Sequence, residues 1–293
     1  MDIRRARNGD VEIAYQCFGS PDGKPLLLIN GSGMQMVMWP EDLCTALVQR
    51  GYFVVRLDNR DSGLSTRLTE FDGRRRRAYE LRDMADDVLA VADAIGARRV
   101  HLVGASLGGM IAQVAAIRHA ERIATLTVLS AGAGAKPWLA RPKFRTVLKT
   151  MRLMRDVPKD ADAAGRQWVE LLRIVGSPDH PVDERHWYAA GALAFERGPY
   201  PEGSMRHTLA TMAVRDLRRQ LAKLTMPTLV VQGAADPMMS WRAAKIVADA
   251  IPGAKFLLLP GVGHELPRGV WPLVLDEIAA LSGEVLQNLD ESP

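Results

Sequence analysis

Short, almost uninterrupted apolar runs recur along this chain, and segments of helical periodicity separate them. The runs occupy residues 25–30, 53–58, 100–104, 124–130, 228–232 and 255–259, and a looser alternation covers 11–18. Continuous apolar character is typical of strands in a parallel sheet that helices cover on both faces. Helical patterns lie between the runs, at residues 39–50, 79–95, 241–250 and 270–281. The alternation predicts an α/β fold with a mostly parallel, doubly wound sheet.

The stretch from residue 134 to residue 224 interrupts this alternation. It contains no strand-like run, and repeated prolines break its helical patterns into short pieces. A chain of 293 residues is long enough for one α/β domain with an insertion. We therefore expect a core formed by residues 1–133 and 225–293, with residues 134–224 inserted as a helical cap, or lid.

Composition excludes several classes of protein. With 47% hydrophobic and 25% charged residues the chain is globular, and a net charge of +4 is too small to indicate a nucleic-acid partner. No apolar run approaches the roughly 18 to 20 residues of a membrane span. The first residues are charged and lack the apolar segment of a secretory signal, so we expect a cytoplasmic protein. Cys17 and Cys44 form no C-x-x-C pair, and self-association into a homo-oligomer is left open.

The segment Gly104-Ala-Ser106-Leu-Gly108 matches the pattern G-x-S-x-G. It directly follows the apolar run at 100–104 and precedes a second apolar stretch, and this strand-to-helix setting is what makes the short motif specific. A turn this tight holds Ser106 in a strained backbone conformation, and glycines at 104 and 108 remove side chains that would collide. The motif predicts that the Ser106 hydroxyl projects as a nucleophile at the carboxyl edge of the sheet.

A serine hydroxyl needs a base, and the base needs a carboxylate that orients it. His264 follows the run at 255–259 through a glycine-containing loop, whereas the other histidines lie inside a strand, at a helix end or in the predicted cap. Asp236 follows the run at 228–232, and Asp58, in a charged turn after an earlier run, is the alternative acid. We favour Asp236, because the setting of Asp58 is typical of a charged turn held by local hydrogen bonds. The chain order Ser106, Asp236, His264 is then that of α/β-hydrolases.

An acyl-transfer reaction also needs hydrogen-bond donors for the oxygen of its tetrahedral intermediate. The backbone N–H of Leu107 is available at the start of the helix that follows the serine. The glycine-rich segment at 30–33 lies at the end of an earlier strand, and its backbone can approach a substrate closely. We therefore expect the N–H groups of Ser32 and Leu107 to form an oxyanion hole.

The whole chain resembles the α/β-hydrolase superfamily. Within it, three segments resemble the aclacinomycin methylesterase-like bacterial carboxylesterases: GDVEIAYQCFGSPDGKPLLLINGSG, VVRLDNRDSGLST and LVGASLGGMIAQ. The resemblance implies the same roles for Ser106, Asp236 and His264, and for the two oxyanion donors. The chain departs from the family in having Asn30-Gly where many members have His-Gly, and Ala105 where histidine is commoner. Neither change alters a reacting group.

Residues next to the predicted site allow a coarse prediction of the pocket. Met34 and Trp39 follow the oxyanion segment, Met238 follows the acid, Leu266 follows the base, and the cap offers Trp138. Methionine and aromatic walls suit a bulky apolar acyl or polycyclic group. In the family that the chain resembles, the cap selects the substrate and is the most variable part, so the resemblance implies little about the substrate.

These observations predict a serine hydrolase that cleaves small-molecule carboxylic esters by an acyl-enzyme mechanism, without a metal or an organic cofactor. A carbon–carbon bond hydrolase and a cofactor-free perhydrolase use the same triad and remain alternatives. A non-hydrolytic small-molecule receptor with the same fold is a third alternative, from a different class of protein.

Overall fold

A central eight-stranded sheet organises the computed structural model, which describes residues 2–68, 79–134 and 143–290. Its strands are β1 (Arg4–Asn8), β2 (Val11–Phe18), β3 (Lys24–Ile29), β4 (Tyr52–Leu57), β5 (Val100–Ala105), β6 (Ile123–Leu129), β7 (Thr228–Gly233) and β8 (Lys255–Leu259). They lie in the order β1-β2-β4-β3-β5-β6-β7-β8. Strand β2 pairs antiparallel with β1 and β4, and the strands from β4 to β8 pair in parallel.

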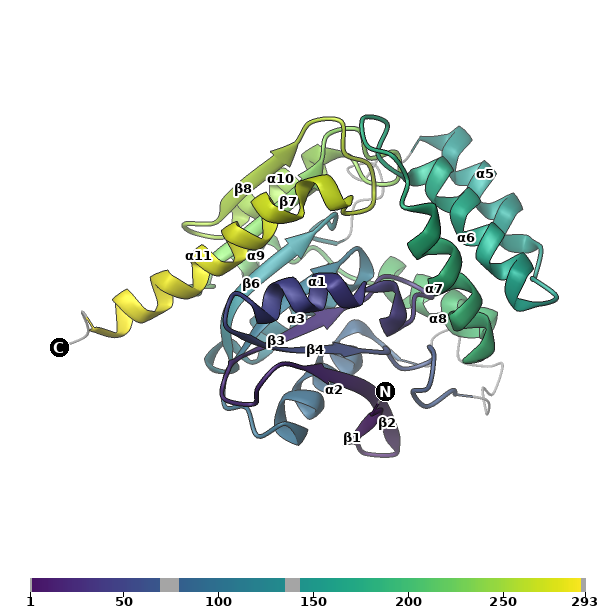
Figure 1. The fold of residues 1–293 in the computed structure, drawn as a ribbon. Helices are drawn as coiled ribbons and strands as arrows, with labels where there is room; N and C mark the ends of the chain where they lie inside the picture. Colours follow the sequence, from purple (N-terminus) through teal and green to yellow (C-terminus); the bar gives the residue numbers. More distant parts are fainter. Residues whose placement is uncertain (1, 69–78, 135–142, 291–293) are drawn as a thin grey trace.

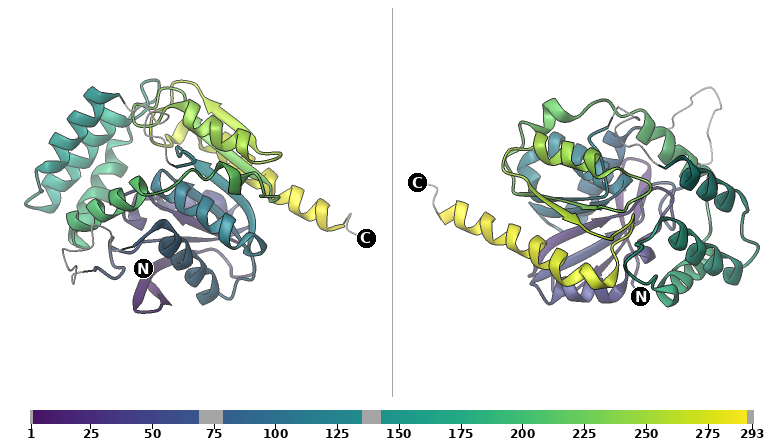
Figure 2. Two further views of the ribbon diagram at one scale, coloured as in Figure 1. Left: turned by 180° about the vertical axis from the view of Figure 1, so that it is seen from behind. Right: turned by 90° about the horizontal axis from the view of Figure 1, so that it is seen from above.

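Helices cover both faces of this sheet (Figures 1 and 2). Helices α1 (Glu41–Val48) and α11 (Trp271–Asp290) pack on one face. On the other face lie α2 (Leu81–Ala94), α3 (Leu107–Arg118) and α10 (Trp241–Ala250). Single turns of 3-10 helix, at Met36–Met38, Ala120–Arg122 and Arg268–Val270, complete the connections. The predicted doubly wound α/β fold is therefore confirmed.

The central strands show why their sequences are apolar throughout. Successive side chains of a strand point to opposite faces of the sheet. In β3, Leu26 and Leu28 join the core beneath α1 and α11, whereas Leu27 and Ile29 join the core beneath α2 and α3. All four side chains are fully buried, so neither face of β3 could carry a polar residue without a partner.

Strand β1 is the one strand in the described residues that the sequence pattern did not predict. It pairs with β2 at the edge of the sheet, and its sequence RRARN has one buried residue, Ala6. Edge strands commonly carry charged residues, which protect an exposed strand edge from further pairing. A charged edge strand therefore has no apolar alternation by which to recognise it.

The segment between β6 and β7 is helical, and no strand occurs in its described part, residues 143–224. It contains α5 (Phe144–Arg155), α6 (Ala161–Val175), α7 (Glu184–Glu196) and α8 (Pro201–Met212), followed by the short α9 (Arg218–Leu221). Helices α5–α8 stand beside the sheet as a separate layer (Figure 1), whereas Leu221 of α9 is buried in the core beneath α3 and α10. Among the described residues no helix has both the length and the apolar character that crossing a membrane requires.

Candidate active site

The turn between β5 and α3 holds Ser106 in a conformation that few residues other than glycine adopt, with φ 54° and ψ −117°. Its neighbours leave no space for side chains. A Cβ atom at Gly104 would lie 2.2 Å from the carbonyl oxygen of Gly108, and one at Gly108 would lie 2.1 Å from the carbonyl oxygen of Ile29. Glycine is therefore required at both positions, and the strain at Ser106 is of the kind found at functional sites.

Helix α3 begins immediately after this serine. The first N–H groups of a helix have no acceptor within the helix, and they attract negative charge. Leu107 is the first residue of α3, and it is buried against the sheet. Its N–H is thus placed to donate to an anionic oxygen bound beside Ser106.

The loop after β3 lies against the serine. A Cβ atom at Gly31 would be 3.5 Å from Cβ of Ser106. The N–H of Gly33 donates to Nδ1 of His207 at 3.1 Å, and the N–H of Met34 donates to the carbonyl oxygen of Gly31 at 3.3 Å. Within the described residues no acceptor is bonded to the N–H of Ser32. Of the three, this N–H is the one free for a ligand.

The structure brings Asp236 and His264 together at the ends of β7 and β8. Nδ1 of His264 lies 2.7 Å from Oδ2 of Asp236. The Asp236 side chain is fully buried, whereas the His264 side chain is 20% exposed. A buried carboxylate at Nδ1 holds the proton on that nitrogen and leaves Nε2 free to act as a base.

Further hydrogen bonds fix the orientation of the Asp236 carboxylate. Oδ1 accepts the N–H groups of Met238 at 2.7 Å and Met239 at 2.9 Å. Oδ2 accepts Nε2 of Gln232 at 2.8 Å in addition to His264. Sequence reasoning missed Gln232, although a glutamine at the end of the apolar run TLVVQ was a usable signal. Each oxygen accepts two bonds, so the carboxylate cannot rotate without losing them.

Most of the predicted site residues line one cavity of about 1010 Å³. Ser106, Ser32 and His264 line it, and Asp236 lies buried behind the histidine. Four of the predicted pocket residues, Met34, Trp39, Met238 and Leu266, also line it. The fifth, Trp138, lies outside the described residues.

Helices α6 and α7 supply the opposite wall of this cavity. Trp168 and Trp187 line it and stack on each other, with ring centroids 6.2 Å apart and an interplanar angle of 14°. The cavity is at the upper end of the usual size for small-molecule sites. In the described part of the chain, no group of three or more histidine, cysteine or acidic side chains is arranged to hold a metal ion.

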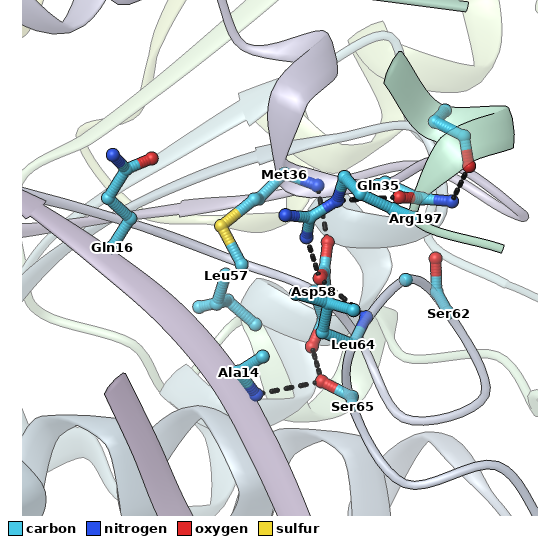
Figure 3. A network of polar contacts seen from close by, with 12 residues as sticks. Ala14, Gln16, Gln35, Met36, Leu57, Asp58, Ser62, Leu64, Ser65 and Arg197 are labelled. Atoms are coloured by element: carbon cyan, nitrogen blue, oxygen red, sulfur yellow. Dashed lines mark hydrogen bonds and ion pairs between the residues drawn. The ribbon is translucent and has the colours of Figure 1, made fainter. Parts of the chain in front are cut away.

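Asp58, the alternative acid, has a different role (Figure 3). Its carboxylate is fully buried and accepts the N–H groups of Met36 at 2.6 Å and Leu64 at 3.0 Å. It also pairs with Arg197, at the carboxyl end of α7, which in turn donates to Gln35. Burial raises the pKa of the Asp58 carboxyl, and the Arg197 guanidinium opposes that rise. Asp58 thus fastens α7 to the loop after β3.

Asp61, three residues further along the same turn, fastens the next helix. Its carboxylate accepts Nε of Arg206 at 2.7 Å and Nη2 at 3.0 Å, and Arg206 belongs to α8. Both residues of this pair are buried. One turn, residues 58–61, therefore holds both α7 and α8 through buried ion pairs, a function that its sequence alone did not reveal.

The loop that carries His264 is held by the connection between α6 and α7. The N–H of His264 donates to the carbonyl oxygen of Val175, and the N–H of Gly263 donates to Oγ of Ser177, both at 2.9 Å. The Glu265 carboxylate accepts the N–H of Ser177 at 3.2 Å, and burial raises the pKa of this carboxyl. Sequence reasoning missed these contacts, because no local pattern links residues about 88 positions apart.

Comparison with known proteins identifies the family of this chain. Residues 24–267 match the family model of the alpha/beta hydrolase fold, so the chain belongs to that family. Two relatives are each 31% identical over 92% of this chain and 94% of their own: rhodomycin D methylesterase DauP of Streptomyces sp. (strain C5) and DnrP of Streptomyces peucetius. The protein is an α/β-hydrolase of the carboxylic ester hydrolase class, and the expected likeness to methylesterases is confirmed.

Solved structures share the fold. A putative lipase from Acinetobacter baumannii superimposes with a TM-score of 0.76 at 20% identity, covering 98% of this chain and 92% of that one. An esterase from Rhodococcus sp. ECU1013 gives 0.74 at 21% identity, covering 96% of this chain and all of that one. At these identities the likeness concerns the fold alone.

The buried pair of Asp58 and Arg197 generates a stability prediction. Arg197→Met leaves the carboxylate without its cation, which should lower the free energy of unfolding by about 3–5 kcal/mol at pH 8. Because the pKa of Asp58 already lies above its value in the unfolded chain, losing Arg197 raises it further. The destabilisation should then be smaller at pH 5 than at pH 8, because a raised pKa favours protonation of the carboxyl as the pH falls, and protonation removes the unpaired charge.

Urea unfolding at both pH values measures this difference against the wild type. Arg197→Lys keeps the positive charge and serves as the matched control, with a smaller loss at pH 8. A destabilisation of Arg197→Met that is the same at pH 5 and pH 8 would contradict the assignment of Asp58 as a buried, charge-dependent anchor.

Proposed function

We propose that this protein is a serine carboxylesterase that forms an acyl-enzyme on Ser106. The observation that carries the proposal is the hydrogen-bonded pair of Asp236 and His264, which reaches the same cavity as the strained serine turn. These groups come from three loops far apart in the chain, all at the carboxyl ends of parallel strands. The alignment of base and carboxylate is the one that nucleophilic catalysis requires.

In the first half of the reaction, Nε2 of His264 takes the hydroxyl proton of Ser106 as Oγ attacks the ester carbonyl carbon. The negative charge moves to the carbonyl oxygen, where the N–H groups of Ser32 and Leu107 stabilise it. Asp236 stabilises the imidazolium that forms. When the tetrahedral intermediate collapses, His264 donates its proton to the departing alcohol, and the acyl group remains on Ser106.

In the second half, a water molecule replaces the alcohol. His264 takes one proton from the water as its oxygen attacks the acyl carbon, and the same two N–H groups stabilise the second intermediate. Collapse of that intermediate returns the proton to Oγ of Ser106 and releases the carboxylic acid. No other reactant is needed, because water supplies both the oxygen and the proton.

We further propose that helices α5–α8 act as a cap over the site and that the substrate is a bulky apolar ester of a small alcohol. The volume of the cavity and its stacked Trp168 and Trp187 support a large apolar group. The relatives that are named rhodomycin D methylesterases support a methyl ester.

Two substitutions test the mechanism with p-nitrophenyl butyrate as substrate. Ser106→Ala should remove turnover, because it deletes the nucleophile. Asp236→Asn should lower kcat by roughly 10³- to 10⁴-fold, because an amide that donates at this position favours the wrong tautomer of His264. The measurement is the initial rate at pH 8, with circular dichroism to show that both variants are folded; undiminished turnover by folded Ser106→Ala overturns the proposal.

A panel of esters tests the substrate class. The value of kcat/KM should be at least about tenfold higher for methyl esters of fused-ring aromatic acids than for methyl butyrate, because the larger acyl groups bury more apolar surface. Trp168→Ala should reduce this preference, whereas Leu273→Ala, exposed on α11, is the matched control and should preserve it. Equal values for large and small acyl groups would contradict a bulky substrate.

A further inference from the structure

Helix α8 contains a histidine that the proposed mechanism does not use. His207 is fully buried, and its ring lies between the loop after β3 and the turn after β4. Nδ1 accepts the N–H of Gly33 at 3.1 Å, and Nε2 lies 2.7 Å from the carbonyl oxygen of Arg60. Both ring nitrogens are therefore bonded to backbone groups that flank the active site.

These two partners define the protonation state of the ring. A backbone N–H only donates, so Nδ1 must carry a lone pair; a carbonyl oxygen only accepts, so Nε2 must carry the proton. The ring is thus the neutral Nε2–H tautomer. Burial also lowers the pKa of His207, which favours the neutral form. A buried neutral ring with both nitrogens satisfied is a rigid link between its two backbone partners.

The loop after β3, which His207 contacts through Gly33, has a flexible sequence that such a link would restrain. Glycines flank Ser32 on both sides, and Gly33 has φ +68°, so the backbone here has wide intrinsic freedom. The contact with His207 fixes the plane of the peptide that joins Ser32 to Gly33, because peptide groups are planar. The Ser32 N–H belongs to the preceding peptide. Once the following peptide is fixed, the direction of the Ser32 N–H depends only on the two backbone dihedral angles of Ser32.

A second residue of α8, Ser204, packs against the loop after β3 from the same side as His207. Oγ of Ser32 lies 3.4 Å from the carbonyl oxygen of Ser204, and a Cβ atom at Gly33 would lie 2.6 Å from Oγ of Ser204. On its other side the loop meets Ser106 through Gly31. The loop is therefore confined between the serine turn and α8, and the Asp61–Arg206 pair anchors α8 one residue before His207.

We infer that His207 is a positioning residue, which holds the Ser32 N–H in the direction that stabilises the oxyanion by accepting the neighbouring Gly33 N–H. This role rests on the function proposed above. It makes α8, part of the proposed cap, a component of the catalytic apparatus, in addition to lining the cavity with Ser204 and Thr208. Because misplacing an oxyanion donor affects the transition state more than the bound ester, the loss should fall on kcat.

Two amide substitutions separate the contacts of the two ring nitrogens. In His207→Asn the side-chain amide is as many bonds from Cα as Nδ1, so it can still accept the Gly33 N–H. In His207→Gln the amide is as many bonds from Cα as Nε2, so it can still donate to Arg60 and loses the contact with Gly33. His207→Leu loses both contacts, and Met212→Ala, 76% exposed on the same helix, is the matched control.

The assay measures kcat and KM with p-nitrophenyl butyrate, the inhibition constant of an alkyl trifluoromethyl ketone, and the thermal midpoint. We expect His207→Gln and His207→Leu to lose about 100-fold in kcat with KM changed by less than about threefold. The ketone mimics the tetrahedral intermediate, so its inhibition constant should rise in the same proportion as kcat/KM falls. His207→Asn should stay within about fivefold of the wild type, and Met212→Ala should match it.

The results distinguish a positioning role from a purely structural one. Equal losses of kcat in His207→Asn and His207→Gln would overturn the inference, as would a folded His207→Leu with kcat within threefold of the wild type. If His207→Leu does not fold, the comparison of the two amide variants decides. Failure of the proposed function looks different, because wild-type turnover would then be absent or would survive Ser106→Ala.

Discussion

The tight packing of the β5–α3 turn is the constraint on which the rest of the site depends. Backbone atoms of Gly108 pack so closely against the end of β3 that a single Cβ atom would clash with the carbonyl oxygen of Ile29. The same packing brings Ser106 against Gly31 and sets the start of α3 beneath it. The serine turn, the loop after β3 and the first turn of α3 are therefore one packed unit, and backbone strain at Ser106 is balanced by this packing.

A second constraint is the turn at residues 58–61, which joins the sheet to the helices that face it. Asp58 pairs with Arg197, at the carboxyl end of α7, and Asp61 pairs with Arg206 of α8. Buried ion pairs add little net stability compared with apolar packing, because each charge must first be desolvated. They do restrict the positions of α7 and α8, because any arrangement that separates a pair would leave a charged side chain buried without a partner. We therefore regard the two pairs as devices that fix where α7 and α8 stand over the cavity.

The strand pattern could be predicted because its cause is local. Strand β8 has the predicted bounds, 255–259, and the runs of the central strands are apolar because helices cover both faces. Strand β1 was missed because a charged edge strand carries no such pattern. The approach of Asp236 to His264 was also predictable, since both follow strands that end at the same edge of the sheet.

Other features depend on tertiary contacts that leave no trace in the local sequence. Asp58 follows a strand as Asp236 does, and only the structure shows that Asp58 pairs with Arg197, 139 positions away. His207 was predicted to lie in the helical segment, but nothing near it in the sequence indicates contact with Gly33, 174 positions away. The packing of α7 and α8 on the loops after β3 and β4 therefore could not be predicted from the sequence and is known only from the structure.

Covalent labelling with a fluorophosphonate tests the central claim most directly. The phosphonyl group should bond to Oγ of Ser106 with loss of fluoride, giving one adduct per chain by mass spectrometry, in the peptide that contains residue 106. His264→Ala should slow the labelling strongly, because the base that activates the hydroxyl is missing. An adduct on a different serine, or a folded wild-type protein that remains unlabelled, would contradict the account.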